Sequence, residues 1–376
     1  MISLVNPPQL QLREPYAYPP LGLCYLAAML DDFDVRIDSL AGEKSISLGH
    51  ADVFGVTFPS ACKESVREVV AYIREEYPES KIFLGGPHPT AKPEETFRDY
   101  SPDYVLAGEC ENLFPHLISH PSSKAIHDGG IVDDLDTLPF PRRDLVDRDV
   151  VVNLTGIHGT EKPSTTILSS RGCPHNCRFC CKCHPMYRVF RDRSPRKVVE
   201  EIRLLKNDYG VEHLRFIDDC FTVKRSLPKL CELMQKEEVT FICITRADHL
   251  NVELTKSLKL AGCTQVDIGV EYLSDRMLGL MNKQLTVEQI AKSVRTLHDV
   301  GVEVKMFLMM RYPGETLEDR ENTLKMLGEL RPEHFTLSVF QPIEGSALEA
   351  NSSYFYPDDD VDRQEYQRQI LEAIGN

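Results

Sequence analysis

β-prone runs alternate with amphipathic stretches along the first third of the chain. The stretch 65–77 places apolar residues at the three- and four-residue spacing of a helix that packs on a core, and a further helix is expected to begin at Leu21. Strands that alternate with helices form parallel sheets, so residues 1–125 are predicted to be a doubly wound α/β domain. The expected strands are 2–5, 34–37, 52–57, 81–84 and 103–106.

The alternation pauses and then resumes as six strand–helix units. Residues 126–164 are rich in Pro, Gly, Asp and Ser and are predicted to be a linker, and residues 346–376 form an acidic tail with a helix expected to start at Asp358–Asp360. Six units favour a partial, open (β/α)6 barrel over residues 165–345, with its chemistry at the C-terminal strand ends. The expected strands are 165–169, 212–217, 240–245, 264–270, 302–308 and 334–339.

Composition narrows the class of partner. The 376 residues carry a net charge of -15, which argues against a nucleic-acid partner because such binding uses clustered Lys and Arg. The apolar start of the chain breaks at Pro7, so it does not resemble a signal peptide, and no apolar run is long enough to cross a membrane. We expect a cytoplasmic protein whose twelve cysteines are reduced.

Three cysteines with short spacing follow the first expected barrel strand. Cys173, Cys177 and Cys180 form a CxxxCxxC motif after Gly172. Thiolates at this spacing can converge on one metal centre. Three ligands leave one iron of a cubane 4Fe-4S cluster open, whereas a structural zinc site takes four.

Zinc is the alternative metal for this motif. Cys181 or Cys183 could supply a fourth thiolate, and the protein would then be a colourless binding or regulatory module. Zinc ribbons and fingers recruit a second ligand pair, however, and no CxxC or HxxxH pair follows. The context favours iron and sulfur, which predicts a brown protein that loses its colour in air.

The motif, with the aromatic Phe179 before its third cysteine, resembles the signature of the radical S-adenosylmethionine (SAM) enzymes. More narrowly, residues 1 to about 350 resemble the subfamily that joins an N-terminal cobalamin-binding, Rossmann-like domain to the radical SAM barrel. The resemblance implies a 4Fe-4S cluster, SAM and cobalamin as cofactors. It implies that the cluster is held by Cys173, Cys177 and Cys180 and not by Cys181 or Cys183.

The resemblance also implies a reaction. An electron donor such as flavodoxin or ferredoxin would reduce the cluster, and SAM on the open iron would be cleaved to a deoxyadenosyl radical that takes a hydrogen atom from the substrate. Methylcobalamin, charged by a second SAM, would then methylate an unactivated carbon of a small or peptide-like molecule. A non-methylating rearrangement or cyclisation remains an alternative outcome.

Polar residues stand at the ends of the expected barrel strands. Asp218 and Asp219 follow the second strand, Arg246 the third and Glu271 the fourth, and each alone could be a helix cap or a solvent-facing charge. The resemblance implies that Phe179 touches the adenine of SAM and Asp218 its amino group. It implies that the residues on the third and fourth strands hold the carboxylate and ribose.

The fifth barrel strand departs from the family in part. Pro313-Gly314-Glu315 matches the family motif, but Met309 and Arg311 stand where the family often has glycine. This departure predicts a reshaped adenine or substrate pocket.

Two loops of the first domain are candidates for cobalamin. Ligands of doubly wound sheets lie beyond the carboxyl ends of the strands, where these loops fall. The Gly85-Gly86 pair alone indicates a tight strand-to-helix turn, but the resemblance implies that the loops hold cobalamin. The implied contacts are Thr57, Ser60, Gly85, Gly86 and Pro87.

One cobalamin motif is missing. The pattern Asp-x-His-x-x-Gly, whose histidine ligates cobalt in many cobalamin proteins, is replaced by the histidine-free region from Asn6 to Gly22. We therefore predict that no protein imidazole ligates cobalt. His88, between two prolines, is the residue placed to contradict this prediction.

Three N-terminal cysteines, Cys24, Cys62 and Cys110, raise the alternative of a methylthiotransferase with a second cluster. Free cysteines are more often small buried hydrophobic residues. Methylthiotransferases also carry a basic RNA-binding domain at the C-terminus, whereas this tail is acidic. Iron content separates the two, because one cluster holds about four atoms and two hold about eight.

Overall fold

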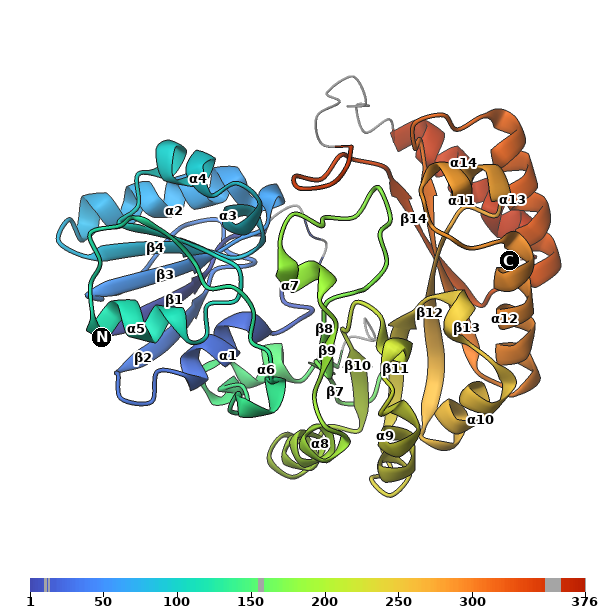
Figure 1. Cartoon of the computed structure of the whole chain (residues 1–376), viewed down its shortest axis with the longest axis horizontal. Coiled ribbons are helices and arrows are strands. Elements are labelled where there is room, and N and C mark those ends of the chain that lie inside the picture. Colours follow the sequence, from blue (N-terminus) through green and yellow to red (C-terminus); the bar gives the residue numbers. More distant parts are fainter. Residues whose placement is uncertain (10–11, 13, 155–158, 349–359, 376) are drawn as a thin grey trace. The chain divides into compact units, whose positions relative to one another are not determined.

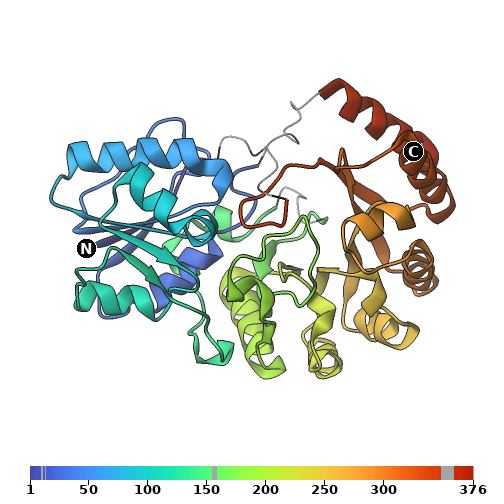
Figure 2. The same cartoon turned by 45° about the horizontal axis from the view of Figure 1, so that its top comes forward.

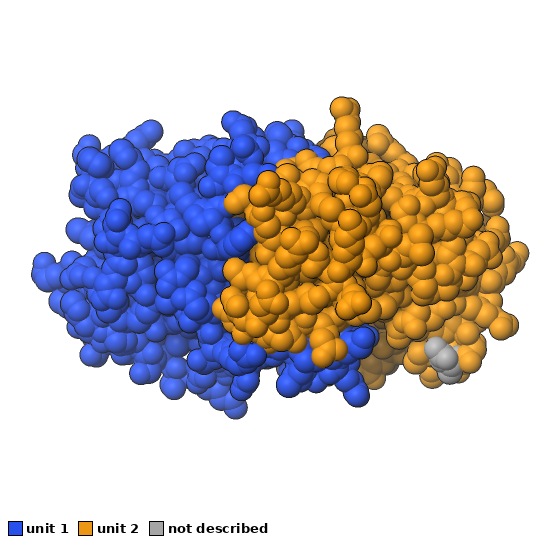
Figure 3. Space-filling model, turned by 90° about the horizontal axis from the view of Figure 1, so that it is seen from below, with its two compact units in different colours: residues 1–165, 182–191 blue, residues 166–181, 192–376 orange. Residues whose placement is uncertain are grey.

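The computed structural model describes residues 1–9, 12, 14–154, 159–348 and 360–375. The chain divides into two compact units (Figure 3). Unit 1 contains residues 1–165 and 182–191, and unit 2 contains residues 166–181 and 192–376. Across the described residues, every helix is too short or too polar to cross a membrane.

Unit 1 is built on a six-stranded parallel sheet in the order β2-β1-β3-β4-β5-β6 (Figure 1). Helices lie on both faces of this sheet. The strands are β1 (Ile2–Asn6), β2 (Val35–Ser39), β3 (Val53–Thr57), β4 (Lys81–Gly85), β5 (Tyr104–Ala107) and β6 (Ile126–Asp128). The helices are α1 (Leu21–Ala28), α2 (Lys63–Glu76), α3 (Pro87–Ala91), α4 (Pro93–Tyr100), α5 (Leu113–Ser119) and α6 (Arg148–Val151), with short 3-10 turns η1 (Ser60–Cys62), η2 (Leu135–Thr137) and η3 (Arg143–Leu145).

Each face of the unit 1 sheet has its own core. The apolar stripe of α2, which includes Val66 and Ile73, packs with Phe54 on one face. On the other face α1 and α5 pack on the sheet, and the Phe114 ring meets Phe83 edge to face. These two cores confirm the predicted doubly wound domain. The segment 126–164, expected to be a linker, lies within unit 1 and contains β6, η2, η3 and α6.

Unit 2 is built on a second six-stranded sheet in the order β14-β13-β12-β11-β10-β7. Its strands are β7 (Ser164–Ile167), β10 (His213–Phe216), β11 (Thr240–Thr245), β12 (Cys263–Glu271), β13 (Glu303–Met310) and β14 (His334–Val339). Its helices are α8 (Pro195–Tyr209), α9 (Leu227–Met234), α10 (Val252–Leu260), α11 (Asp275–Leu280), α12 (Val287–Asp299), α13 (Leu317–Leu330) and α14 (Asp360–Ile374). Short elements complete the described chain: β8 (Ser170–Arg171), α7 (Pro185–Arg188), β9 (Arg191–Asp192), η4 (Phe221–Val223) and η5 (Ala247–His249).

The helices from α8 to α13 follow one face of this sheet (Figures 1 and 2). Local signals set their ends: the Ser194 side chain accepts from the Lys197 amide at the start of α8, and Gly210 ends the helix with φ 70°. A capping box of Thr286 and Gln289 starts α12. The partial barrel predicted for this half of the chain is confirmed.

The other face of the unit 2 sheet is less covered. Along β13, Val304, Met306 and Leu308 are buried, whereas the alternating residues Lys305 and Phe307 are only half-buried. Thr336 and Ser338, which pair in register with Phe307 and Met309, are exposed on β14. One face of the sheet therefore remains accessible at its β13–β14 edge.

The acidic tail packs on the barrel helices. Asp358 and Asp359, two residues of the predicted helix start, lie outside the described residues, and α14 begins at Asp360. Asp362 of α14 pairs with Arg311 at 2.9 Å and with Arg320 at 3.0 Å. The tail thus contacts the segment that follows β13.

Candidate active site

The three predicted ligand cysteines lie in the loop that follows β7. Gly172 turns the chain with φ 79°, a conformation that favours glycine, directly before Cys173. Cys173, Cys177 and Cys180 are partly exposed, whereas Cys231, for example, is buried in the barrel wall. The Cys180 amide donates to the Cys177 carbonyl at 3.3 Å, so the last two thiols share one turn.

Contacts from the end of α11 and the end of β11 hold this loop in unit 2. Asn282 donates to the Asn176 carbonyl at 2.7 Å, and the Arg178 amide donates to the Met281 carbonyl at 3.0 Å. The Arg246 guanidinium lies 3.8 Å from the Cys177 sulfur. Three partly exposed thiols on one loop are a donor set that fits a cluster with three protein ligands.

The Asp218 carboxylate makes four contacts with neighbouring protein groups. Its carboxylate accepts from the Ser169 amide and from the hydroxyls of Ser169 and Ser170 at 2.6 to 2.8 Å. It also pairs with Lys224 at 2.6 Å, and neither side chain has more than 1% of its surface exposed. Asp218 therefore braces the start of the cysteine loop, and Lys224 is a residue that the sequence reasoning missed.

Phe179, Arg246 and Glu271 gather around a second missed residue, Lys283. The Lys283 ammonium pairs with the Glu271 carboxylate at 2.7 Å and lies 5.3 Å from the centre of the Phe179 ring. Arg246 donates to the Lys283 carbonyl at 2.7 Å and pairs with Asp248. The structure thus brings three of the four predicted SAM residues to one place, with a cation among them.

Two of these strand ends carry left-handed backbone. Glu271 has φ 65° where the pairing between β12 and β13 shifts register, and Arg311 has φ 61° directly after β13. Arg311 occupies a position where the radical SAM family often has glycine. Its backbone has the left-handed conformation that favours glycine, so the arginine is strained. Ion pairing with Asp362 holds its side chain.

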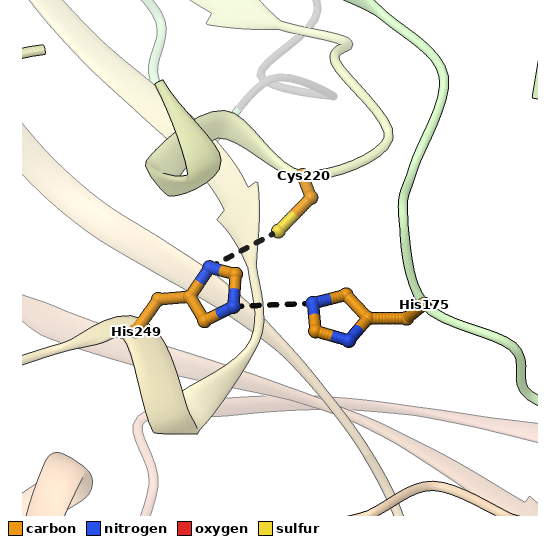
Figure 4. A group of neighbouring side chains, drawn as sticks. All are labelled: His175, Cys220 and His249. Carbon is orange, nitrogen blue, oxygen red and sulfur yellow. Dashed lines mark hydrogen bonds between the residues drawn. The ribbon is translucent and has the colours of Figure 1, made fainter. Parts of the chain in front are cut away.

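A further group, which the sequence reasoning did not single out, lies at the ends of β10 and β11. Cys220 follows β10, His249 ends η5 and His175 lies inside the cysteine loop (Figure 4). Burial raises the pKa of the Cys220 thiol, against a lowering by its contact with Thr245. Burial also lowers the pKa of His249, which favours its neutral form. Asp218 and Arg246 were predicted because they are polar residues that follow strands. The same rule could have identified Cys220 after β10 and His249 after β11.

The predicted cobalamin loops lie at the carboxyl ends of β3 and β4. Gly86 has φ 99°, and a Cβ there would clash with the Thr57 hydroxyl and approach the Phe58 nitrogen at 2.9 Å. A Cβ on Gly85 would meet nothing closer than 3.6 Å. Gly86 is therefore required for the close approach of the two loops, and Pro87 then starts α3.

His88 points into this packing. Its side chain is fully buried, its Nδ1 lies 3.0 Å from the Ser60 hydroxyl, and its ring packs on Phe58. Ser60, a predicted cobalamin contact, therefore touches His88. The burial supports the prediction that His88 does not ligate cobalt, because a ligand must reach the cofactor.

The histidine-free region after β1 forms a cavity of about 400 Å³. Its lining includes Asn6 and Leu12. The order of strands in unit 1 reverses between β1 and β3, and ligands of doubly wound sheets lie at such a reversal. The cavity thus stands on one side of this position and the Thr57 loop on the other.

The N-terminal cysteines are built into the unit 1 core. Cys24 and Cys62 are buried, and burial raises the pKa of Cys24 to about 11 and that of Cys110 to about 12. None of the metal-ligand groups found among the described residues includes them. This burial favours a packing role over a second cluster.

Two family models match the chain. The model of the radical SAM superfamily matches residues 167–327, and the model of the B12 binding domain matches residues 15–118. The first range contains Cys173, Cys177, Cys180 and the four predicted SAM residues. The second contains the Thr57 and Gly85–Pro87 loops.

Similar proteins cover most of the chain. An uncharacterized methyltransferase of Pyrococcus horikoshii is 28% identical over 361 residues, which span 88% of this chain and 77% of that protein. The radical SAM methyltransferase TsrM of Kitasatospora setae, solved with cobalamin and a 4Fe-4S cluster, superposes with a TM-score of 0.74 at 16% identity over 93% of this chain and 73% of TsrM. The cobalamin-dependent SAM radical enzyme OxsB superposes at 0.73 and 18% identity, over 99% of this chain and 56% of OxsB.

Proposed function

We propose that this chain, a radical SAM protein that carries an N-terminal B12-binding domain, is a methyltransferase that acts on an unactivated carbon of a small or peptide-like molecule. One observation carries the proposal: the three-thiol loop and a B12-binding domain occur on the same chain. The relative from Pyrococcus horikoshii and TsrM are both named methyltransferases. TsrM has also been solved with tryptophan as substrate, which supports a small molecule here.

The cofactors supply the bond-breaking chemistry: a reduced 4Fe-4S cluster cleaves SAM, and cobalamin carries the methyl group. The chain places them. Cys173, Cys177 and Cys180 would hold three irons and leave the fourth open, and an electron donor such as flavodoxin or ferredoxin would reduce the cluster. Cys183 is exposed, and the three-thiol motif is complete without it, which supports its exclusion from the ligand set.

The proposed SAM contacts are Phe179, Arg246, Glu271 and Asp218. The Phe179 ring offers a flat surface for adenine, and Lys283 adds a cation that can attract the SAM carboxylate. For Asp218, contact with the SAM ammonium requires that it take the place of the Lys224 ammonium, since the other acceptor positions are used. The chain thus presents groups of both signs to a zwitterionic ligand.

The proposed cobalamin contacts are Thr57, Ser60 and Gly85 to Pro87. The close approach of the two loops leaves backbone rather than bulky side chains at the carboxyl ends of β3 and β4. Electron paramagnetic resonance of the Co(II) form tests for a nitrogen ligand, because such a ligand splits the cobalt lines into triplets. We expect no triplets; triplets that vanish in His88→Ala would show that histidine ligates cobalt.

Anaerobic reconstitution with iron, sulfide, hydroxocobalamin, SAM and a reductant tests the function without knowledge of the substrate. We expect about four irons per chain, deoxyadenosine from SAM cleavage, and S-adenosylhomocysteine formed together with methylated cobalamin. Deoxyadenosine without S-adenosylhomocysteine would overturn the methyltransferase and leave a non-methylating radical reaction. A colourless protein that holds zinc in place of iron would overturn both.

A further inference from the structure

Cys220, His249 and His175 form the one metal-ligand group found among the described residues, and it includes none of the cluster cysteines. One ligand atom from each lies within 4.8 Å of the other two (Figure 4). His175 Nε2 lies 3.1 Å from His249 Nε2, and Cys220 Sγ lies 3.7 Å from His249 Nδ1. Three separate loops thus bring soft and borderline donors to one point.

The donor set is one that zinc prefers. A thiolate bonds zinc at about 2.3 Å and imidazoles at about 2.0–2.1 Å, so neighbouring ligand atoms of a tetrahedral ion lie roughly 3.3–3.7 Å apart. The two shortest separations here, 3.1 and 3.7 Å, are close to that range. Because they use opposite nitrogens of His249, a single His249 nitrogen makes only one of them, and the longest separation in the group, which is within 4.8 Å, must shorten by about 1 Å when one ion binds.

The surroundings of the thiol also suit a ligand. Cys220 is fully buried, and the Thr245 hydroxyl lies 3.7 Å from its sulfur, where it can donate to a thiolate. Such an outer hydrogen bond orients a ligating side chain. Without an ion the same three groups can join in a neutral chain of hydrogen bonds through His249, so the arrangement is also stable empty.

We propose that Cys220, His249 and His175 bind one zinc-type divalent ion, with the fourth position open to water. Binding releases one proton, from the Cys220 thiol, as the sulfur–metal bond forms. The ion ties the loop between Cys173 and Cys177 to the ends of β10 and β11. It is distinct from the 4Fe-4S cluster and does not depend on the methyltransferase assignment.

The bound ion would stabilise the conformation of the cysteine loop. The segment from Cys173 to Cys177 has no helix or strand of its own, so its geometry before cluster assembly depends on contacts from other loops. A metal bond to His175 removes conformational freedom from this segment, and metal binding of this kind is coupled directly to local folding. Loss of the ion is therefore expected to slow cluster assembly and to speed bleaching of the cluster by a chelator.

Metal analysis of the reconstituted full-length protein tests the site. With an equimolar supply of Zn²⁺ we expect about one zinc beside about four irons per chain. Cys220→Ala and His175→Asn should each lower bound zinc at least about tenfold, while iron assembles more slowly but still reaches about four atoms per chain. Cys231→Ala, which removes a buried thiol from α9, is the matched control and should retain zinc. Zinc retained in both site variants, or no zinc in the wild type, overturns the proposal.

Zinc-edge X-ray absorption keeps the test valid if the variants fold poorly, because it uses the wild-type protein and does not detect iron. We expect one sulfur neighbour at about 2.3 Å and two or three nitrogen or oxygen neighbours at about 2.0–2.1 Å. A spectrum with three or four sulfur neighbours would place zinc on the cluster cysteines and overturn the proposal.

Discussion

The two parallel sheets of this protein differ in where they carry charge. In unit 1 the central strands β1, β3 and β5 have no ionised side chain, and β4 between them has only Lys81, exposed at its first residue. Helices cover both faces of the sheet. In unit 2, strands β10, β12 and β13 carry charges within the strands, on the face opposite the buried row of β13. These charges are Arg215, Asp267, Glu271, Glu303 and Lys305.

The difference agrees with the ligand positions that we propose for each unit. Buried ion pairs such as Arg215–Asp267, at 2.7 Å, contribute little net stability because desolvation offsets the attraction. Their presence in the strands of unit 2 therefore suits a sheet that binds a polar ligand along its own strands and strand ends. In unit 1 the charges lie on the outer strands and at the exposed start of β4, and the proposed contacts are confined to the loops.

Cysteine substitutions should give the largest effect on iron content. We expect the thiols of the unit 2 loop to be cluster ligands and the thiols of unit 1 to be packing residues. Cys173→Ala, Cys177→Ala or Cys180→Ala should each reduce iron from about four atoms per chain to nearly none and abolish SAM cleavage. Cys110→Ala, in unit 1, should leave iron and colour unchanged. Loss of iron in Cys181→Ala or Cys183→Ala would refute the three-ligand assignment.

The buried pair of Asp218 and Lys224 should give the next largest effect. Asp218→Asn leaves the Lys224 ammonium buried without a charge partner, which should cost about 3–5 kcal/mol in the free energy of unfolding. Urea unfolding of the full chain measures this cost. The double variant Asp218→Asn/Lys224→Met should recover part of it, because the unpaired charge is gone. A cost below about 1 kcal/mol for the single variant would show that the pair is not buried in solution.

The sequence predicted the sheets better than the contacts within the site. Strands such as β11 and β14 match the predicted ranges at both ends. A short apolar run between two amphipathic helices is most readily explained as a buried strand. Strand β6 was missed: its three residues Ile126 to Asp128 contain one apolar side chain, so no periodicity marks them. Its pairing with β5 comes from the tertiary fold.

The site was predictable only where spacing or strand ends identify residues. Arg246 and Glu271 follow strands, and the structure brings both against Lys283. Lys283 itself lies in a loop after α11, and nothing in its local sequence indicates a partner twelve residues earlier. Lys224 was missed for the same reason, because only the fold buries it beside Asp218.

The next prediction concerns Gly86, because in unit 1 the proposed ligand contacts depend on the close approach of two loops. In Gly86→Ala the new Cβ meets Thr57 and Phe58, and the backbone keeps a conformation that alanine disfavours by about 1–3 kcal/mol. We expect that loss in urea unfolding and weaker binding of hydroxocobalamin in equilibrium dialysis. Gly85→Ala is the matched control, since its Cβ has room. Equal cobalamin affinity in the two variants would show that the loop approach does not serve the cofactor.

The smallest expected effect comes from Asp103, which joins the ends of strands in unit 1. Its carboxylate accepts from the Ile82 amide and pairs with Lys81 and Arg74 at 2.9 Å. Burial alone would raise the pKa of Asp103, but these three contacts outweigh it and lower the pKa. Because Lys81 and Arg74 remain partly in water, Asp103→Asn should cost only about 1 kcal/mol in the free energy of unfolding.

The pH dependence of that cost follows from the sign of the shift. A lowered pKa means that the folded state holds the proton less tightly than the unfolded chain, so the carboxylate stabilises the fold above the unfolded pKa of about 3.9. The difference in urea midpoint between the wild type and Asp103→Asn should be constant from about pH 8 to 5 and should shrink as the pH falls below about 4. Lys81→Met keeps the carboxylate and the Arg74 contact, so it should show a smaller difference over the same range. A cost for Asp103→Asn as large as that for Asp218→Asn would mean that charge stabilises both sheets alike, and the contrast between the units would fail.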